Sequence, residues 1–225
     1  MTEFAQFLAL SFSALFPLIN PVGSSLVFLG MVGVTSGDVY RMLARKIAIS
    51  TVLFLVAIDV SGAAVLKVFG ISLPIVQLAG GLVVAAMGWG LLNQKEASGA
   101  GDPSPAPADL IDLQHKVFYP FTFPITAGPG TLVVMLTVSA HASKGVFTHI
   151  ALAQLGVLAG VVLNCIAVYF AYAFAPKITA RVSPSTAHGI LRVIAFVLLC
   201  IGVQIAWNGL SSLIATFGPV PHPHH

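Results

Sequence analysis

Charged residues are scarce in this chain of 225 residues. It holds only 10 Lys and Arg and 7 Asp and Glu, or 8% of the sequence, against 57% hydrophobic residues. A soluble domain carries about 25% charged residues, so this chain has too few to cover a surface in contact with water. The cations are also scattered along the chain, which excludes the dense basic patch of a nucleic-acid-binding protein.

Cysteines and catalytic signatures are equally sparse. Cys165 and Cys200 lie inside apolar runs, where we expect small hydrophobic side chains and neither a disulfide nor a metal pair. The sequence contains no G-x-S-x-G, no H-E-x-x-H, no P-loop and no Cys/His cluster with metal-ligand spacing. We therefore expect a protein that is not an enzyme, uses no cofactor and does not drive transport with ATP by itself.

Long apolar runs are abundant. A helix that spans a membrane needs about 20 mostly apolar residues, and no charge occurs within residues 4–37, 68–94, 117–143, 145–176 or 193–225. A further apolar run, Ile47–Ile58, ends at Asp59. The sequence predicts an all-α membrane protein with six transmembrane helices, at Glu3–Gly33, Ile47–Leu66, Leu73–Leu92, Val117–Ala140, Ile150–Phe174 and Gly189–Ile214. Because Glu3 is the only charge before the first run, we expect a retained helix and not a cleaved signal.

The positions of Lys and Arg predict the orientation, since these residues concentrate in cytoplasmic loops. With the N-terminus outside, only Lys67 and Lys144 fall in outer loops. The cytoplasmic side then holds Arg41, Arg45, Lys46, Lys95, Lys116, Lys177 and Arg181. We therefore expect a multi-pass protein of the inner membrane, with both termini in the periplasm and the lipid bilayer as its surroundings.

One long polar stretch divides the chain near its middle. Residues 95–116 include SGAGDPSPAPAD, whose Gly, Pro and Ser content is typical of a linker that packs no core. The predicted organisation is a first three-helix repeat at 1–94, a cytoplasmic linker at 95–116, a second repeat at 117–214 and a tail at 215–225. The tail ends in HPHH, on which we base no function.

The two halves share a motif at the same place in their first helix. Residues 16–24 are FPLINPVGS and residues 123–131 are FPITAGPGT, with Phe-Pro, the closing Gly and the hydroxyl residue aligned. Each half has three spans, an odd number, so the second copy must enter the membrane from the opposite side. The sequence therefore predicts an inverted repeat, an architecture common among secondary transporters.

Proline and glycine in both motifs predict interrupted helices, because proline removes a backbone donor and glycine adds freedom. Backbone freed at membrane depth survives only where it is buried or lines a wet cavity. New helix starts, with Ser24, Ser25 and Thr131 suited as N-caps, would attract an anionic group such as a carboxylate. A plain proline kink is the alternative. The candidate substrate-binding residues are Asn20, Pro21, Gly23, Ser24, Thr126, Gly128, Pro129, Gly130 and Thr131.

The paired motifs resemble those of the MarC family of bacterial inner-membrane proteins. Asn20-Pro21-Val22-Gly23 and Gly128-Pro129-Gly130 carry the resemblance, which extends from about Phe4 to Leu213. The family includes neutral amino-acid transporters for glycine and alanine. The resemblance implies an ion- or proton-coupled secondary transporter of small neutral amino acids. The alternatives are an exporter of other small metabolites or drugs, a channel, and a membrane scaffold that transports nothing.

Other polar residues in the spans have structural or functional interpretations. Asp59 is a candidate for ion coupling, because an acid inside a membrane is costly; snorkelling or pairing is its alternative. For Arg192 we favour snorkelling. The remaining side chains fit hydrogen bonds between helices (Gln77, Asn164, Gln204 and Asn208), solvated positions at span ends (His115, His141 and His149), or close helix packing (Gly80, Gly81 and Gly88).

Overall fold

The computed structural model describes residues 2–33, 35–93, 110–143, 147–177 and 184–217, and every named element in these ranges is helical. Most of the predicted linker, the His-rich end of the tail, Lys144 and Arg181 lie outside the described residues. The elements are α1 (Thr2–Ile19), α2 (Pro21–Val32), α3 (Gly37–Val68), α4 (Leu73–Leu92), α5 (Leu110–His115), η1 (Val117–Thr126), α6 (Pro129–Ala142), α7 (Phe147–Ala173) and α9 (Pro184–Phe217).

The described helices supply five or six membrane spans. Five segments are long and apolar enough to cross a bilayer, and α1 and α2 together form the first of them. The sixth is the pair η1 and α6, which bends by 71° at its break. The all-α membrane fold is therefore confirmed, and the bounds predicted for α4, Leu73–Leu92, are those observed.

The predicted start of the second span is wrong. We placed it at Ile47, but α3 begins ten residues earlier, at Gly37. Ser36 caps this start by accepting a hydrogen bond from the Val39 amide at 3.4 Å. The first turns of α3 therefore carry charges such as Arg41, because a helix can continue beyond the hydrocarbon that hydropathy detects.

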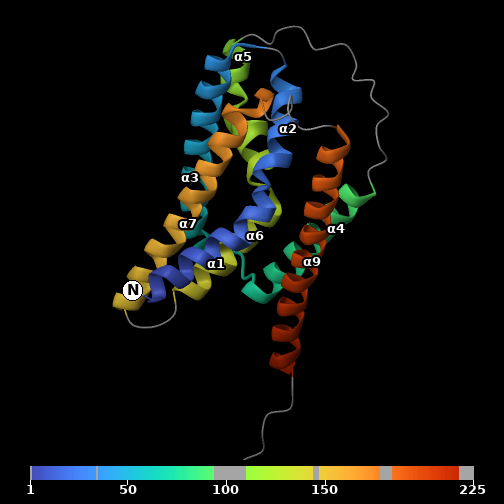
Figure 1. Cartoon of the computed structure of the whole chain (residues 1–225). Coiled ribbons are helices and arrows are strands. Elements are labelled where there is room, and N and C mark those ends of the chain that lie inside the picture. The colour runs from blue at the N-terminus through green and yellow to red at the C-terminus, as the bar shows by residue number, and fades with distance from the viewer. Residues whose placement is uncertain (1, 34, 94–109, 144–146, 178–183, 218–225) are drawn as a thin grey trace, which may run out of the picture.

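Helices from the first half of the chain pack against helices from the second half (Figure 1). In this arrangement α1 lies along α7, α4 lies along α9, and α3 contacts α7, η1 and α6. The pair α4 and α9 stands at one side of the bundle (Figure 1). These contacts join the two halves of the chain, while their inverted orientation stays a prediction.

Glycines bring the paired helices into close contact. A Cβ built on Gly81 of α4 would lie 2.3 Å from the Ala206 amide nitrogen of α9, and one on Gly202 would lie 2.3 Å from that of Ala85. On the other pair, a Cβ at Gly156 would come within 2.5 Å of the Phe4 carbonyl oxygen. Small residues let membrane helices approach this closely, so the packing interpretation of the α4 glycines is confirmed.

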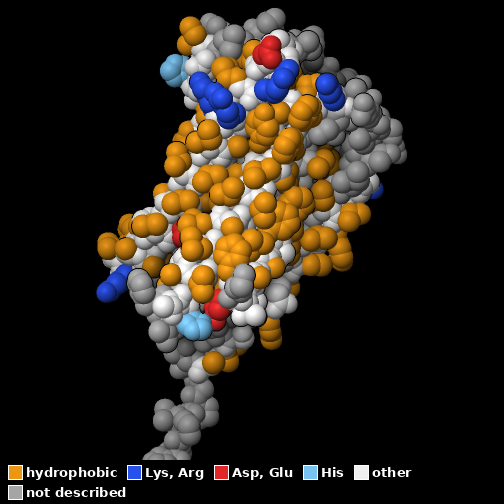
Figure 2. Space-filling model, turned by 60° about the vertical axis from the view of Figure 1, so that its left-hand side comes forward, with side chains coloured by type: hydrophobic (Ala, Val, Ile, Leu, Met, Phe, Trp, Pro, Cys, Tyr) orange, Lys and Arg blue, Asp and Glu red, His pale blue; other side chains and the backbone are white. Residues whose placement is uncertain are grey.

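Cations gather at one end of the molecule. In Figure 2 most of the visible Lys and Arg side chains lie at the upper end, above a broad band of hydrophobic side chains. The start of α3, with Arg41 and Arg45, and Lys116 after α5 belong to this cation-rich end. The start of α1 and the end of α9 lie at the opposite end (Figure 1). This arrangement suits an even number of spans.

Labelling of single cysteines is expected to place the cation-rich end in the cytoplasm. With Cys165 and Cys200 replaced, Arg41→Cys should be labelled only after the membrane is made permeable, whereas Lys67→Cys should react with an impermeant reagent in intact cells. The two positions lie near the two ends of α3, so each is the control for the other. Labelling of both from the same side would contradict α3 as a membrane span, and labelling with the sides exchanged would reverse the orientation.

Candidate functional site

The first span is interrupted at one residue. Asn20 has φ 44° and ψ 66°, in the left-handed region, and separates α1 from α2. Its side chain caps α2, because Oδ1 accepts a hydrogen bond from the Gly23 amide at 3.0 Å. Pro21 then occupies the first helical position, where its missing N–H costs nothing. Pro17, in contrast, lies inside α1 without ending it.

The predicted N-caps are wrong by a few residues. The caps are Asn20 for α2 and Gly128 for α6, whereas Ser24 and Thr131 lie in the first turn of each helix. Ser24 Oγ donates to the Asn20 carbonyl at 2.9 Å and therefore does not cap an amide. Asn can adopt the left-handed conformation at the break, and that requirement outweighs the preference for a hydroxyl at the cap.

The second span is interrupted over a longer stretch. In η1 the backbone makes wide turns, with the Ala127 amide donating to the Thr122 carbonyl at 2.8 Å. Two residues, Tyr119 and Phe123, are extended within it, and each precedes a proline. Proline forces the preceding residue away from helical angles, so the sequence explains both interruptions. Both peptide bonds before these prolines are cis.

The hydroxyl of Thr131 has no partner in the part of the chain that the structure describes. Thr131 is 1% exposed, and its Oγ1 is buried without a hydrogen bond. Its amide donates to the Gly128 carbonyl at 3.0 Å. A buried polar atom without a partner costs about 1–3 kcal/mol, so it calls for an explanation such as a ligand.

The two interruptions meet at Tyr172 of α7. Its hydroxyl lies 2.8 Å from Thr126 Oγ1 at the end of η1, and it also interacts with the Ser24 side chain of α2. All three residues are buried. The structure thus brings the two sequence motifs together. Sequence analysis missed Tyr172, whose only signal is a hydroxyl inside an apolar run.

An aromatic cluster lies at the cation-rich end of this polar contact. Phe28 stacks on Tyr172 with ring centroids 4.6 Å apart. It also forms edge-to-face contacts with Phe121 and Tyr40, whose ring centroids lie 5.3 Å and 6.1 Å from its own. All four residues are 3% exposed or less. They belong to α2, α3, η1 and α7, so the cluster packs these four elements against one another.

The motif glycines pack against protein atoms. A Cβ on Gly130 would lie 2.4 Å from Val84 Cγ2 and 3.2 Å from Leu18 Cδ2. A Cβ on Gly23 would lie 2.2 Å from the Asn20 side-chain amide. The amides of Gly23 and Ser24 already donate to Asn20. Capture of a carboxylate by these amides, as we expected, would require their present acceptors to leave.

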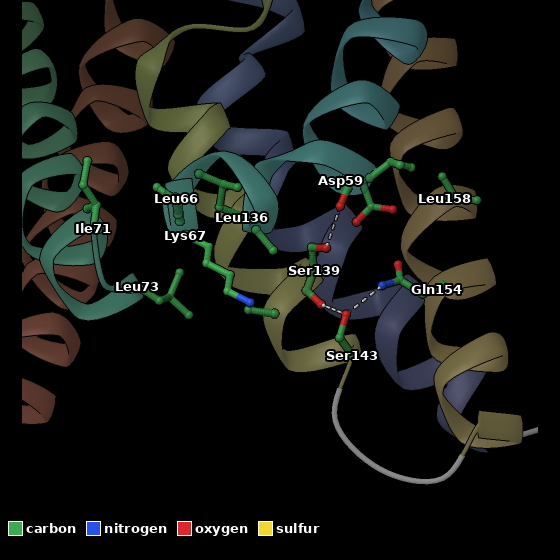
Figure 3. Close-up of a pocket in the computed structure, with 13 residues that line it drawn as sticks. Asp59, Leu66, Lys67, Ile71, Leu73, Leu136, Ser139, Ser143, Gln154 and Leu158 are labelled. Carbon is green, nitrogen blue, oxygen red and sulfur yellow. Dashed lines mark hydrogen bonds between the residues drawn. The ribbon is translucent and has the colours of Figure 1, made fainter. Parts of the chain in front are cut away.

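A large cavity lies at the other end of the bundle, away from the cations. Its volume is about 810 Å³, and it lies between the second half of α3, the end of α6 and the start of α7. Exposed residues such as Val60, Lys67 and Ser143 line it, so it reaches the surface. Asp59, the candidate for ion coupling, is half-buried in its wall (Figure 3). We call this cavity the outer pocket.

The hydrogen bonds between helices predicted for four polar residues are confirmed for two of them. Gln204 instead donates to Asn208 within α9 at 2.9 Å. The Asn164 side chain is fully buried and donates to the carbonyls of Gly160 at 2.9 Å and Phe12 at 3.4 Å. This confirms a hydrogen bond between α7 and α1. Gln77 lies 3.5 Å from Thr137 and joins α4 to α6. No group of three or more His, Cys, Asp or Glu within the described ranges could hold a metal ion.

Comparison with known proteins identifies the family. The sequence pattern of the family described as "MarC family integral membrane protein" matches residues 5–214 of this chain. The inner membrane protein MarC of Escherichia coli is 27% identical over 222 residues, covering 96% of this chain and all of the relative. Membrane protein YvbG of Bacillus subtilis is 28% identical over 213 residues, covering 92% and 96% respectively. No solved structure matches the chain. With its apolar spans, this protein is a multi-pass inner-membrane protein and belongs to the MarC family.

Proposed function

We propose that this protein is a secondary transporter of small neutral amino acids, coupled to an ion gradient. The observation that carries the proposal is the meeting of two interrupted spans, one from each half, at the buried Ser24, Thr126 and Tyr172 hydroxyls. Interrupted helices that meet at the interface of two repeats are where secondary transporters bind their substrates and ions. The unpartnered Thr131 hydroxyl supplies a free polar group in the same segment.

The buried aromatic cluster on one side and the cavity on the other support alternating access. The aromatic cluster around Phe28 fills the cation-rich end, while the outer pocket is open at the other. A transporter that exposes its site to one side at a time must close the bundle on the opposite side. On the predicted orientation, this conformation faces outward. Opening the inner end would separate Phe28 from Phe121 and Tyr172.

Counterflow in liposomes tests this function. Liposomes that contain purified protein and unlabelled alanine inside should take up labelled alanine faster than liposomes loaded with buffer alone. Alaninamide, which lacks the carboxylate, should not compete. A channel would give uptake without stimulation from the inside, and a scaffold would give none. Either of these outcomes would overturn the proposal.

Thr131→Val is the matched variant for the same assay. Valine has the shape of threonine, and Oγ1 has no partner in the described protein, so stability should stay unchanged or rise slightly. We expect counterflow to fall because a polar group of the binding segment is lost. The control is Ser13→Ala, which removes an exposed hydroxyl on α1 that donates to the Leu10 carbonyl of the same helix. Equal counterflow in parent and Thr131→Val would remove Thr131 from the site.

A further inference from the structure

A second cavity is a groove along the seam between α3 and α7. Its lining residues lie at positions i, i+3, i+4 and i+7 of each helix, from Arg45 to Val52 on α3 and from Val162 to Tyr169 on α7. This spacing places the four residues of each helix on one face, over a length of about 10 Å. The volume of the groove is about 320 Å³. We call it the side groove.

Small side chains make the side groove hollow. Ala48 and Cys165 form its floor and are 9% and 3% exposed. Larger apolar side chains form its rim and are much more exposed, at 53% for Ile49, 43% for Val162 and 45% for Ile166. Exposed apolar side chains in the middle of a membrane span face the hydrocarbon tails of lipids. The side groove therefore opens to the bilayer.

The polar residues of the side groove lie at one of its ends. The helices α3 and α7 lie side by side and run in opposite directions, so the start of α3 and the end of α7 are both at the cation-rich end (Figure 1). Arg45 and Tyr169 therefore share this end of the groove. Arg45 comes just before the apolar run Ile47–Ile58, which is where the lipid head groups begin. Tyrosine is also enriched at that level.

The Arg45 guanidinium is exposed and forms no ion pair or hydrogen bond with another described residue. Other cations at this end are already paired. Arg41 lies 3.2 Å from the Asp38 carboxylate. Lys116 lies 2.6 Å from the Asp112 carboxylate. A guanidinium binds a phosphate through two parallel N–H bonds. Arg45 thus offers a phosphate-binding group at the end of an apolar groove.

We propose that the side groove binds one anionic phospholipid from the leaflet at the cation-rich end. Arg45 holds the phosphate of the head group, and the apolar faces of α3 and α7 hold part of one acyl chain. A lipid in this position contacts both helices, so it stabilises their packing. The assignment is independent of the transport proposal, because it uses no residue of the interrupted helices or of the outer pocket.

The charge at the side groove favours a lipid over a second copy of this chain. Two copies related by an axis along the membrane normal would bring their cation-rich ends together, and like charges repel. A soluble phosphate compound would pair with Arg45 but would leave the apolar faces uncovered. An anionic lipid matches both parts of the groove, and anionic leaflets attract basic residues near their surface.

Probes that differ in one part at a time test the side groove. The purified full chain, freed of lipid in detergent, is measured by thermal shift and by native mass spectrometry, which counts the lipids that stay bound. The probes are dioleoylphosphatidylglycerol, dioleoylphosphatidylcholine, which has the same chains and no net charge, and glycerol 3-phosphate, which has no chain. Phosphatidylglycerol should raise the melting temperature most, and glycerol 3-phosphate least.

Variants of Arg45 test the contact with the phosphate. Arg45→Gln should weaken phosphatidylglycerol binding about fivefold, as expected for one basic residue near an anionic surface, and bring it to the level of phosphatidylcholine. Arg45→Lys keeps the charge but loses the two parallel bonds, so its affinity should lie between. The matched control is Lys116→Gln, which removes a cation already paired with Asp112 at the same end and should change nothing.

Variants of the apolar wall test the contact with the acyl chain. Ala48→Leu fills the floor of the groove and should weaken both phospholipids. Because leucine there can also strain the packing of α3 on α7, Ile49→Ala is measured beside it. Ile49 is an exposed rim residue, so its truncation should weaken both phospholipids by a smaller factor and leave the melting temperature in lipid-free detergent near that of the parent.

The preference for phosphatidylglycerol decides the assignment. Its loss in Arg45→Gln and retention in Lys116→Gln support the lipid, whatever counterflow shows. Equal stabilisation by both phospholipids, or full preference in Arg45→Gln, overturns it. Glycerol 3-phosphate acting as strongly as phosphatidylglycerol would show an anion site without a chain and also overturns it. So does cross-linking of Ile166→Cys between two copies in membranes, with Cys165 and Cys200 replaced, because a second copy would then cover the groove.

Discussion

Asn20→Val is expected to destabilise the protein by about 2–4 kcal/mol. Asn20 has φ 44°, a conformation that costs most L-residues about 1–2 kcal/mol and disfavours a β-branched side chain further. Valine also removes the cap on the Gly23 amide, for which about 0.5–2 kcal/mol is typical. Because this amide lies inside the bundle, no bulk water replaces the lost acceptor. Thermal unfolding in detergent, followed by loss of the monodisperse elution peak, measures the change.

Asn20→Gly separates the two causes. Glycine adopts positive φ without strain but supplies no cap, so it should recover part of the loss and unfold between the parent and Asn20→Val. Equal melting temperatures for the glycine and valine variants would show that the left-handed backbone is not what requires asparagine at this position.

The transmembrane segments were predictable because hydropathy and helix ends coincide over much of the chain. For α4 the bounds agree, since Ser72 and Pro74 mark its start and Asn93 its end. For α3 they do not, because the helix continues ten residues into the charged sequence before Ile47. Hydropathy detects the part in hydrocarbon, whereas backbone hydrogen bonds extend the helix beyond it. The orientation remains a prediction that labelling tests, and the inverted repeat also stays a prediction.

The interruptions were predictable, and their detailed chemistry was not. Proline and glycine predicted breaks in both motifs, and the structure places them at Asn20 and across η1. The cap of α2 was missed because residue preference favours hydroxyls, while the left-handed backbone selects Asn20. Such a choice depends on how the two half-helices meet, which local sequence does not specify. Tyr172, which joins both interruptions, has no local motif at all.

Only one polar residue of the outer pocket could be predicted from the sequence. Asp59 stands out as an acid in an apolar run, and its position in the sequence already suggested a functional role. Gln154 and Ser143 carry no such signal, because polar residues are common near the ends of spans. They join α6 to α7, because Gln154 Nε2 donates to Ser143 Oγ at 3.2 Å. Only the packing of α6 against α7 brings these residues together.

Gly130→Ala is expected to destabilise the protein by about 1–3 kcal/mol, as extra atoms in a packed site usually do. The new Cβ would lie 2.4 Å from Val84 Cγ2, the end of a stiff β-branched side chain on α4. The sequence analysis placed Gly130 among the candidate substrate-binding residues. The contacts instead predict strain between α6 and α4, with transport lost as a consequence of packing.

Adding Val84→Ala to the Gly130→Ala variant decides whether Gly130 is required for helix packing or for contact with solute. It removes the clashing methyl groups, and the two Cβ atoms would then lie 3.6 Å apart, an ordinary contact. Val84→Ala alone should also destabilise, because Val84 is 1% exposed and its loss leaves a cavity. The double variant should therefore be more stable than the two single losses predict, with a coupling of about 0.5–3 kcal/mol. Counterflow should recover together with thermal stability. If stability recovers and counterflow does not, the added methyl group occupies space that the solute needs, and Gly130 belongs to the binding site after all.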